Sequence, residues 1–123
     1  MIQVFKKFMV IVVVLFLFNC EQIIEVEDIS NEQIVVLSPV NNTTLTSNEV
    51  NFTWEPLDFA EQYQLQIAHP NFEAAEVFVE DTIITANSFI KPLVTNTYQW
   101  RVRALNFAYE TQYTTQNLTI EDQ

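Results

Sequence analysis

The two side chains of this 123-residue sequence best suited to nucleophilic catalysis or to a transition-metal site are the single cysteine, Cys20, and the single histidine, His69. A catalytic thiol needs a neighbouring imidazole that a third group orients, and a metal site needs three or four ligands. His69 stands directly before Pro70, and the sequence offers it no second histidine. We therefore expect no triad, no metal site and no cofactor, and a protein that is not an enzyme.

Paired carboxylates, which could serve acid–base catalysis, occur here as sequence neighbours: Glu80 with Asp81, and Glu27 with Asp28. Adjacent residues of a strand point to opposite faces, so neither pair converges on one site. The sequence also lacks glycine altogether, which excludes glycine-rich phosphate-binding loops and EF-hand loops. Because asparagine tolerates positive φ better than most residues, we expect it at the tight turns. The candidates are Asn42, Asn71, Asn96 and Asn106.

Cys20 stands where lipid could be attached to it. Lys6 and Lys7 precede an apolar run over residues 8–18, too short to cross a bilayer but of the length of a signal-peptide core. Residues 17–20, Leu-Phe-Asn-Cys, resemble the lipobox of bacterial lipoproteins, in which a peptidase cuts before a cysteine that carries acyl chains. The resemblance implies a signal peptide over residues 1–19 and a lipid-anchored protein of the bacterial cell envelope, at the outer membrane. The alternative is an ordinary cleaved signal with an incidental thiol.

The sequence after residue 19 is strongly acidic, with Lys91, Arg101 and Arg103 as its cations against all 16 carboxylates of the chain. Such a surface repels nucleic acid, which we exclude as a partner. Residues 20–33 hold five carboxylates and no cation, which predicts an extended tether that keeps the domain off the lipid. An acidic stretch in this place resembles the signals that export some Bacteroidetes lipoproteins to the cell surface. The alternative is a plain solvated linker.

From residue 34 to 121 apolar and polar residues alternate, which is typical of strands with one buried face. Pro and Asn clusters separate the alternating segments at short intervals. Seven short strands in one small domain predict an all-β fold, a seven-stranded antiparallel β-sandwich. The strands are expected at residues 34–37, 49–55, 61–68, 76–85, 87–91, 97–105 and 111–120.

Four segments resemble the fibronectin type III domain, an immunoglobulin-like sandwich. They are residues 37–39 (Leu-Ser-Pro), 52–56 (Phe-Thr-Trp-Glu-Pro), 63–67 (Tyr-Gln-Leu-Gln-Ile) and 98–106 (Tyr-Gln-Trp-Arg-Val-Arg-Ala-Leu-Asn). The resemblance implies that Trp54 lies across the core, facing Tyr63 and Trp100. The stretch from 93 to 98 is about one residue shorter than the family's usual corner, which leaves the position of Tyr98 open.

The solvent face of the sheet is one candidate binding surface. Alternation places on it amide and guanidinium side chains, which hydrogen-bond sugar hydroxyls or a partner's carboxylates. The alternative is that the arginines are counter-charges of an acidic domain, with their stems covering the sheet. The candidate residues are Gln64, Gln66, Arg101 and Arg103, with Gln99 and either Gln112 or Thr114 beside them.

Loops at one tip of the sandwich form the second candidate surface. Leu57 and Phe59 lie between the second and third expected strands, and Phe107 and Tyr109 follow Asn106. Exposed aromatic residues in neighbouring loops of a rigid scaffold favour recognition of a partner. The alternative is that these rings cap the ends of the core.

Two functions remain open at this point. The first is a non-catalytic, lipid-anchored interaction module of the cell envelope, for adhesion or as the accessory subunit of a larger complex, with a protein partner. The second is a glycan-binding surface lipoprotein. In addition, Asp81-Thr82-Ile83 resembles the Bacteroidetes O-glycosylation pattern, which makes Thr82 a candidate for modification.

Overall fold

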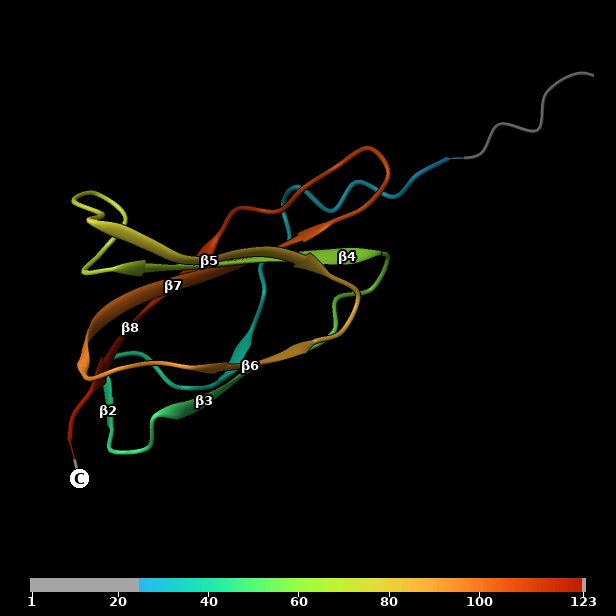
Figure 1. The fold of residues 1–123 in the computed structure, drawn as a ribbon. Coiled ribbons are helices and arrows are strands. Elements are labelled where there is room, and N and C mark those ends of the chain that lie inside the picture. The colour runs from blue at the N-terminus through green and yellow to red at the C-terminus, as the bar shows by residue number, and fades with distance from the viewer. Residues whose placement is uncertain (1–24, 123) are drawn as a thin grey trace, which may run out of the picture.

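The computed structural model describes residues 25–122, which form two β-sheets packed face to face (Figure 1). One sheet has three strands in the order β1-β3-β6, and the other has five in the order β2-β8-β7-β4-β5. The predicted all-β sandwich is confirmed, whereas Cys20 and the expected signal peptide lie outside the described residues. The strands are β1 Val36–Ser38, β2 Thr43–Leu45, β3 Glu49–Trp54, β4 Gln62–His69, β5 Val77–Ile84, β6 Ser88–Pro92, β7 Asn96–Leu105 and β8 Thr114–Ile120.

Each of the seven expected segments overlaps one strand, with bounds that differ by a few residues, but the structure adds an eighth, β2. This strand pairs in parallel with β8, so the expectation of a purely antiparallel, seven-stranded sandwich is wrong in this detail. In β2, Leu45 packs against the core between polar neighbours. Three residues with one apolar side chain give no alternation from which a strand could be predicted.

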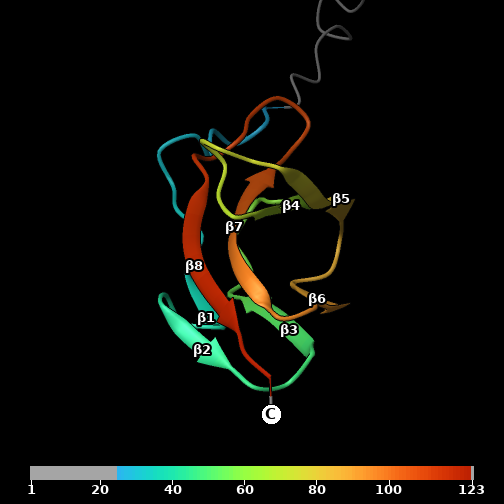
Figure 2. The same ribbon diagram turned by 60° about the vertical axis from the view of Figure 1, so that its left-hand side comes forward.

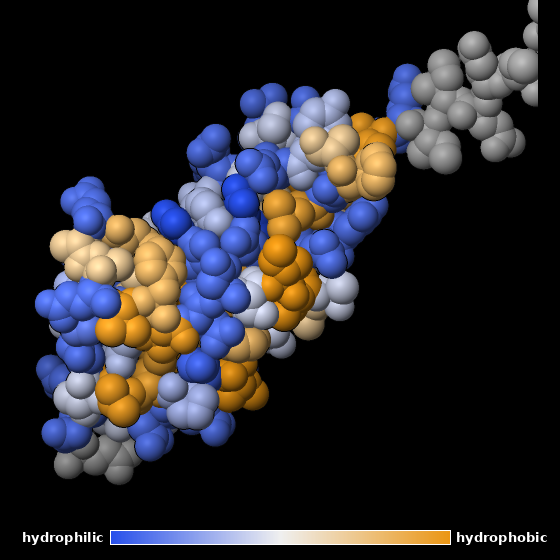
Figure 3. Space-filling model, turned by 45° about the horizontal axis from the view of Figure 1, so that its top comes forward, coloured by the Kyte–Doolittle hydropathy of each residue, from blue (hydrophilic) through white to orange (hydrophobic). Residues whose placement is uncertain are grey.

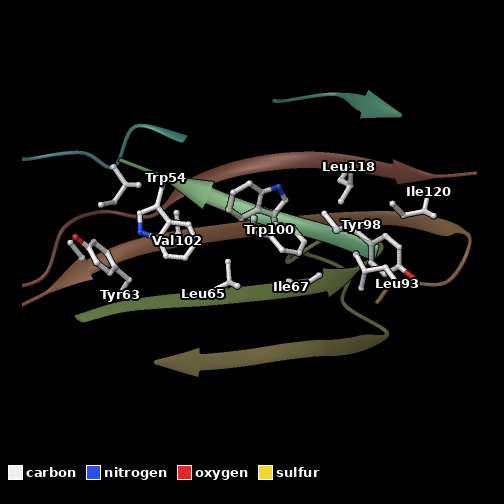
Figure 4. Close-up of a cluster of buried hydrophobic side chains, with 14 of the residues drawn as sticks. Trp54, Tyr63, Leu65, Ile67, Leu93, Tyr98, Trp100, Val102, Leu118 and Ile120 are labelled. Atoms are coloured by element: carbon white, nitrogen blue, oxygen red, sulfur yellow. The ribbon is translucent and has the colours of Figure 1, made fainter. Parts of the chain in front are cut away.

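The core consists of large apolar side chains from both sheets (Figure 4). Trp54 packs edge-on against Tyr63 with ring centroids 5.6 Å apart, as expected, but the ring on Trp100 is Phe52, at 4.8 Å. Phe52 and Trp54 lie two residues apart on β3, so they meet different positions of the facing sheet. Neither indole N–H has an acceptor among the described residues. Both tryptophans therefore stabilise the fold through burial of their rings.

The short corner before β7 keeps Tyr98 in the core. Its ring is 4% exposed, and its hydroxyl donates a hydrogen bond of 2.7 Å to the carbonyl of Val94. Burial raises the pKa of this phenol above its ordinary value. The shortened stretch therefore does not displace the tyrosine from its place in the fold.

Two described residues have positive φ: Asn42 at 62° and Phe59 at 66°. Asn42 was expected, whereas Phe59 was not, because a bulky residue in this region is a steric outlier. The expectation is wrong for Asn71, Asn96 and Asn106. These three shape their turns with the side chain instead, since each Oδ1 accepts a hydrogen bond from a nearby backbone N–H.

The acidic segment before β1 is part of the packed domain. Ile29 and Ile34 are 2% and 3% exposed and belong to the core, while the carboxylates around them are exposed. Burying one isoleucine stabilises the fold by about 1.5–3 kcal/mol. This gain exceeds the repulsion between the exposed carboxylates, which water and salt screen. The expected tether over residues 20–33 therefore differs from the structure in its second half, and the packed unit begins before residue 34.

Candidate binding surfaces

The four predicted sheet-face residues lie together on the outer face of the five-stranded sheet. β4 and β7 pair so that Gln64 stands opposite Arg103 and Gln66 opposite Arg101. Nε of Arg101 donates to Oε1 of Gln66 at 2.7 Å, while Nε and Nη2 of Arg103 both donate to Oε1 of Gln64, at 3.0 and 2.7 Å. The two amides thus hold the two guanidinium groups in place.

Aromatic rings complete this arrangement. The guanidinium carbon of Arg101 lies 4.0 Å from the ring centroid of Phe72 and 4.3 Å from that of Tyr113, and that of Arg103 lies 4.6 Å from Tyr113. We call these four residues, Phe72, Arg101, Tyr113 and Arg103, the cation–aromatic ladder. Cation–π contacts of this kind contribute about 0.5–1 kcal/mol each at exposed sites and about 2 when desolvated. One alternative drawn from the sequence is that the stems of the arginines cover the sheet. The position of both arginines over the sheet face agrees with that part of the alternative.

The sequence did not identify Phe72 and Tyr113. Phe72 follows a proline turn, and Tyr113 comes before β8, which begins at residue 114 rather than at 111 as expected. Neither ring belongs to an alternating core segment. An aromatic residue outside that alternation, in a chain with two arginines on one exposed face, is the signal that could have indicated the ladder.

The described lysine and arginine side chains differ in whether a carboxylate pairs with them. Lys91 pairs with Glu80 at 2.9 Å, and Arg103 pairs with Glu110 at 3.1 Å. Arg101 forms no ion pair with a carboxylate of residues 25–122, and within that range its Nη1 and Nη2 groups have no hydrogen-bond acceptor. The guanidinium group of Arg101 is half-buried between two rings and keeps free donors.

Apolar side chains border the ladder on the side of β5. Phe78, 51% exposed, lies with its ring centroid 5.8 Å from that of Phe72. Ile83, 53% exposed, pairs with Gln64 in register and so shares the outer face. Figure 3 looks onto this side of the molecule and shows hydrophobic areas separated by polar groups. The surface combines an uncompensated cation with apolar contact area and a polar rim.

The loop after β7 lies beside the start of the described chain at one end of the sandwich (Figure 2), and the loop after β3 joins them there. Nδ2 of Asn106 donates to the carbonyl of Glu27 at 2.8 Å and to that of Phe59 at 3.3 Å, which joins the three segments. We call residues 25–32, 56–60 and 106–110 the N-terminal tip.

The four predicted tip residues differ in exposure. Phe59 is 65% exposed, Phe107 86% and Tyr109 38%, whereas Leu57 packs partly against the core. The core-capping alternative therefore describes Leu57. The carboxylates near these rings are exposed as well, and hydrogen bonds from Ser30 hold the pKa of Asp28 below its ordinary value.

A polar hollow of about 490 Å³ lies at the opposite end of the five-stranded sheet, near the start of β7. Its lining includes the side-chain amides of Asn42, Asn71, Gln99 and Asn117 and the carboxylate-bearing Glu73. Amides and a carboxylate can hydrogen-bond sugar hydroxyls. The aromatic residue in the lining, Tyr98, turns its ring into the core.

The remaining predicted positions show little sign of chemistry. Thr82 is half-buried on the edge strand β5 and pairs with Leu65, so its side chain faces inward while Ile83 faces outward. Nδ1 of His69 lies 2.8 Å from the carbonyl of Thr97. Within residues 25–122, no three His, Cys, Asp or Glu side chains gather as metal ligands, and no helix has the length and apolarity to span a membrane.

The two packed sheets with this strand order define a fibronectin type III-like sandwich. The chain is similar in structure to the fn3 domain of human collagen alpha-1(XX) chain, with a TM-score of 0.56 at 12% identity over 76% of this chain and 91% of that one. It is also similar to the fibronectin type III domain derived from human KIAA0970 protein, with a TM-score of 0.53 at 13% identity over 73% and 74%.

These likenesses confirm the predicted fold, and at such identities they show the fold alone. No family model matches the sequence, and no curated protein is significantly similar to it. Domains of the fibronectin type III kind are generally non-catalytic and typically serve as binding modules. The site itself must therefore be argued from this chain's own residues.

Proposed function

We propose that this protein is a non-catalytic interaction module, held in the bacterial cell envelope by a lipidated Cys20, that binds a protein partner on the outer face of its five-stranded sheet. The observation that carries the proposal is the guanidinium group of Arg101. It is fixed between Phe72 and Tyr113, has no carboxylate partner among the described residues and keeps free Nη donors. Although the chain has 16 carboxylates, none of those in residues 25–122 pairs with this cation.

The surroundings of Arg101 suit a carboxylate presented by another protein. A guanidinium group binds a carboxylate through charge-assisted, often bidentate, hydrogen bonds. Phe78 and Ile83 beside the ladder offer apolar contact, and arginine with aromatic residues is the composition of interface hot spots. Because Gln66 and the two rings already hold the guanidinium group, binding costs little side-chain entropy.

The anchor rests on the sequence pattern at residues 6–20 and places the domain at the outer membrane, with exposure at the cell surface as the further expectation. Adhesion and service as an accessory subunit of an envelope complex both fit such a module. A chain held at the membrane gains effective concentration toward a partner in the same membrane. A single modest surface is then sufficient for a lasting association.

Glycan binding is the second candidate, and the polar hollow near the start of β7 favours it. Asn71, Glu73 and Asn117 could bind sugar hydroxyls there. Sugar sites usually add an aromatic platform to such groups, but the ring of Tyr98 points into the core. The hollow therefore supports this candidate less than the ladder supports a protein partner.

Quantitative capture of a partner from envelope extracts tests the site. Arg101→Gln should weaken capture about tenfold or more, the effect of a hot-spot residue. Lys91→Gln removes the same charge at a distance, where Lys91 is already paired with Glu80, and is the matched control. Equal losses in both variants would indicate unspecific electrostatics, and no loss in Arg101→Gln would exclude the ladder. Binding on a glycan array that Glu73→Gln abolishes would favour the second candidate.

The anchor needs its own test, in the native host. We expect the wild-type protein to partition with membranes and to incorporate a labelled fatty acid, and Cys20→Ala to lose both properties. Cys20→Ser is the conservative comparison, because it keeps the size of the side chain without the thiol. A Cys20→Ala protein that stays membrane-bound with unchanged processing would contradict the anchor.

A further inference from the structure

The N-terminal tip exposes two large apolar rings to solvent, although burial of such rings is favourable. Phe107 is 86% and Phe59 65% exposed, the former being the most exposed large apolar side chain of the described residues. Phe59 also has φ of 66°, a conformation that costs a bulky residue backbone strain. Strain of this kind persists where the surrounding structure enforces it, and here it holds a ring in solvent.

The chain enters the domain at this same tip. Asn106 fixes the backbone of Glu27 to the loop that carries Phe59, and Ile29 is buried in the core. The path from Cys20 to Glu25 covers five residues, which span at most about 18 Å when fully extended. The tip thus cannot lie far from the lipid to which Cys20 would be attached.

We propose that the N-terminal tip docks on the membrane surface, with the rings of Phe59 and Phe107 at the boundary between headgroups and acyl chains. This inference rests on the lipid anchor of the proposed function. It replaces the expected standoff tether, because the buried Ile29 leaves only a short segment between lipid and domain. Phenylalanine rings on the surface of peripheral membrane proteins bury favourably at the boundary between headgroups and acyl chains. Docking also turns the end with the polar hollow outward and sets the ladder side-on to the membrane.

The charge of the tip selects the kind of membrane surface. Exposed carboxylates surround the rings, and no described lysine or arginine belongs to the tip segments. Anionic headgroups would repel this end over about 10 Å at moderate salt. The tip therefore suits a zwitterionic surface such as phosphatidylethanolamine or phosphatidylcholine. The carboxylates are those of Glu25, Glu27, Asp28, Glu32, Asp58 and Glu110.

A reconstitution with chemical coupling tests this orientation. The mature chain from residue 20 is attached through Cys20, the single cysteine, to a maleimide lipid in phosphatidylcholine vesicles that contain brominated acyl chains. Phe107→Trp reports contact with the acyl chains through quenching of its fluorescence. Val94→Trp, at a 74% exposed position in the loop between β6 and β7, is the matched control at the other end. The native tryptophans are buried and give the same background in both variants.

We expect quenching to remove most of the fluorescence that Phe107→Trp adds and little of that from Val94→Trp. Added phosphatidylglycerol should reduce this quenching, and salt should restore it. Equal quenching of both probes, or of neither, would overturn the proposal. A cross-link from position 107 to a protein instead of to lipid, formed in the native envelope, would also overturn the proposal. Because coupling is chemical, these results do not depend on lipidation in the cell, and the Cys20→Ala experiment tests that separately.

Discussion

The outer sheet face and the N-terminal tip both expose aromatic side chains, but they hold them differently. On the sheet face, Phe72 and Tyr113 contact guanidinium groups that glutamines also bind. At the tip, Phe59 and Phe107 stand away from the domain on loops. Polar contacts fix the first set in one geometry, whereas the second set gains from water-free surroundings that the domain alone does not supply.

This difference separates two kinds of exposed surface. A ladder whose arginines are held by glutamines and aromatic rings is rigid, and removing one member disturbs its neighbours, so stability and binding should be coupled there. Loop rings without packing partners can be lost at little cost to the fold, so their effect should be confined to binding. Substitutions in the two regions, and in the core beneath them, can test this distinction.

The largest effect is expected in the core beneath the tip. Trp54→Ala deletes a fully buried ring that packs on Tyr63, whose hydroxyl accepts a hydrogen bond from the backbone of Leu57. Deletions of this size cost about 3–5 kcal/mol of unfolding free energy, measurable by urea denaturation. A loss below that of exposed-site variants would mean that the tip does not depend on this core pair.

Ile29→Ala should have the next largest effect, a loss of about 2–4 kcal/mol, as for other buried aliphatic truncations. The change should also release residues 25–33 from the domain, which hydrogen exchange of their amides would detect. The amides of β4 and β7 on the sheet side should keep their relative protection. If residues 25–33 exchange freely in the wild type already, the segment is a tether and the tip lacks its third part.

How far the sequence predicted these regions depends on the range of the interactions. The strands and the core followed from alternation, because a side chain's face is fixed by its position in a strand. Gln64 and Arg101 were placed correctly for the same reason, since both lie within regular strands. Phe72 and Tyr113 come from irregular segments whose approach to the arginines depends on tertiary contacts, which no local pattern records.

The acidic segment is a second case in which a tertiary contact, invisible in the local sequence pattern, decides the structure. Its charge predicted an extended tether, because composition averages over the segment and the carboxylates dominate that average. Burial of a single isoleucine makes the segment part of the domain instead. Ile29 fills a position in the core, and the carboxylates remain in solvent. The positive φ of Phe59 was equally beyond prediction, since residue preferences argue against it.

A smaller effect is expected at the ladder. Tyr113→Ala removes the ring shared by Arg101 and Arg103 and should cost about 1–2 kcal/mol of stability, the sum of two modest cation–π contacts. A double-mutant cycle with Arg101→Gln should give a coupling energy of at least about 0.5 kcal/mol. Additive losses in this cycle would show that ring and cation are neighbours without interaction, and the contrast with the tip would disappear.

The smallest effect on stability is expected at Phe107, and there the contrast is sharpest. Phe107→Ala removes a ring that is 86% exposed, so the unfolding free energy should change by no more than about 0.5 kcal/mol, as for surface substitutions. When both proteins are coupled through Cys20 to zwitterionic vesicles, the tip of the variant should dock less than that of wild type. The amides of residues 106–110 should therefore exchange hydrogen faster in the variant. Tyr109→Ala is the matched control, because its parent ring is less exposed, at 38%. A stability loss as large as that of Tyr113→Ala would place the Phe107 ring in the packed structure, and the two regions would then hold their aromatic side chains in the same way.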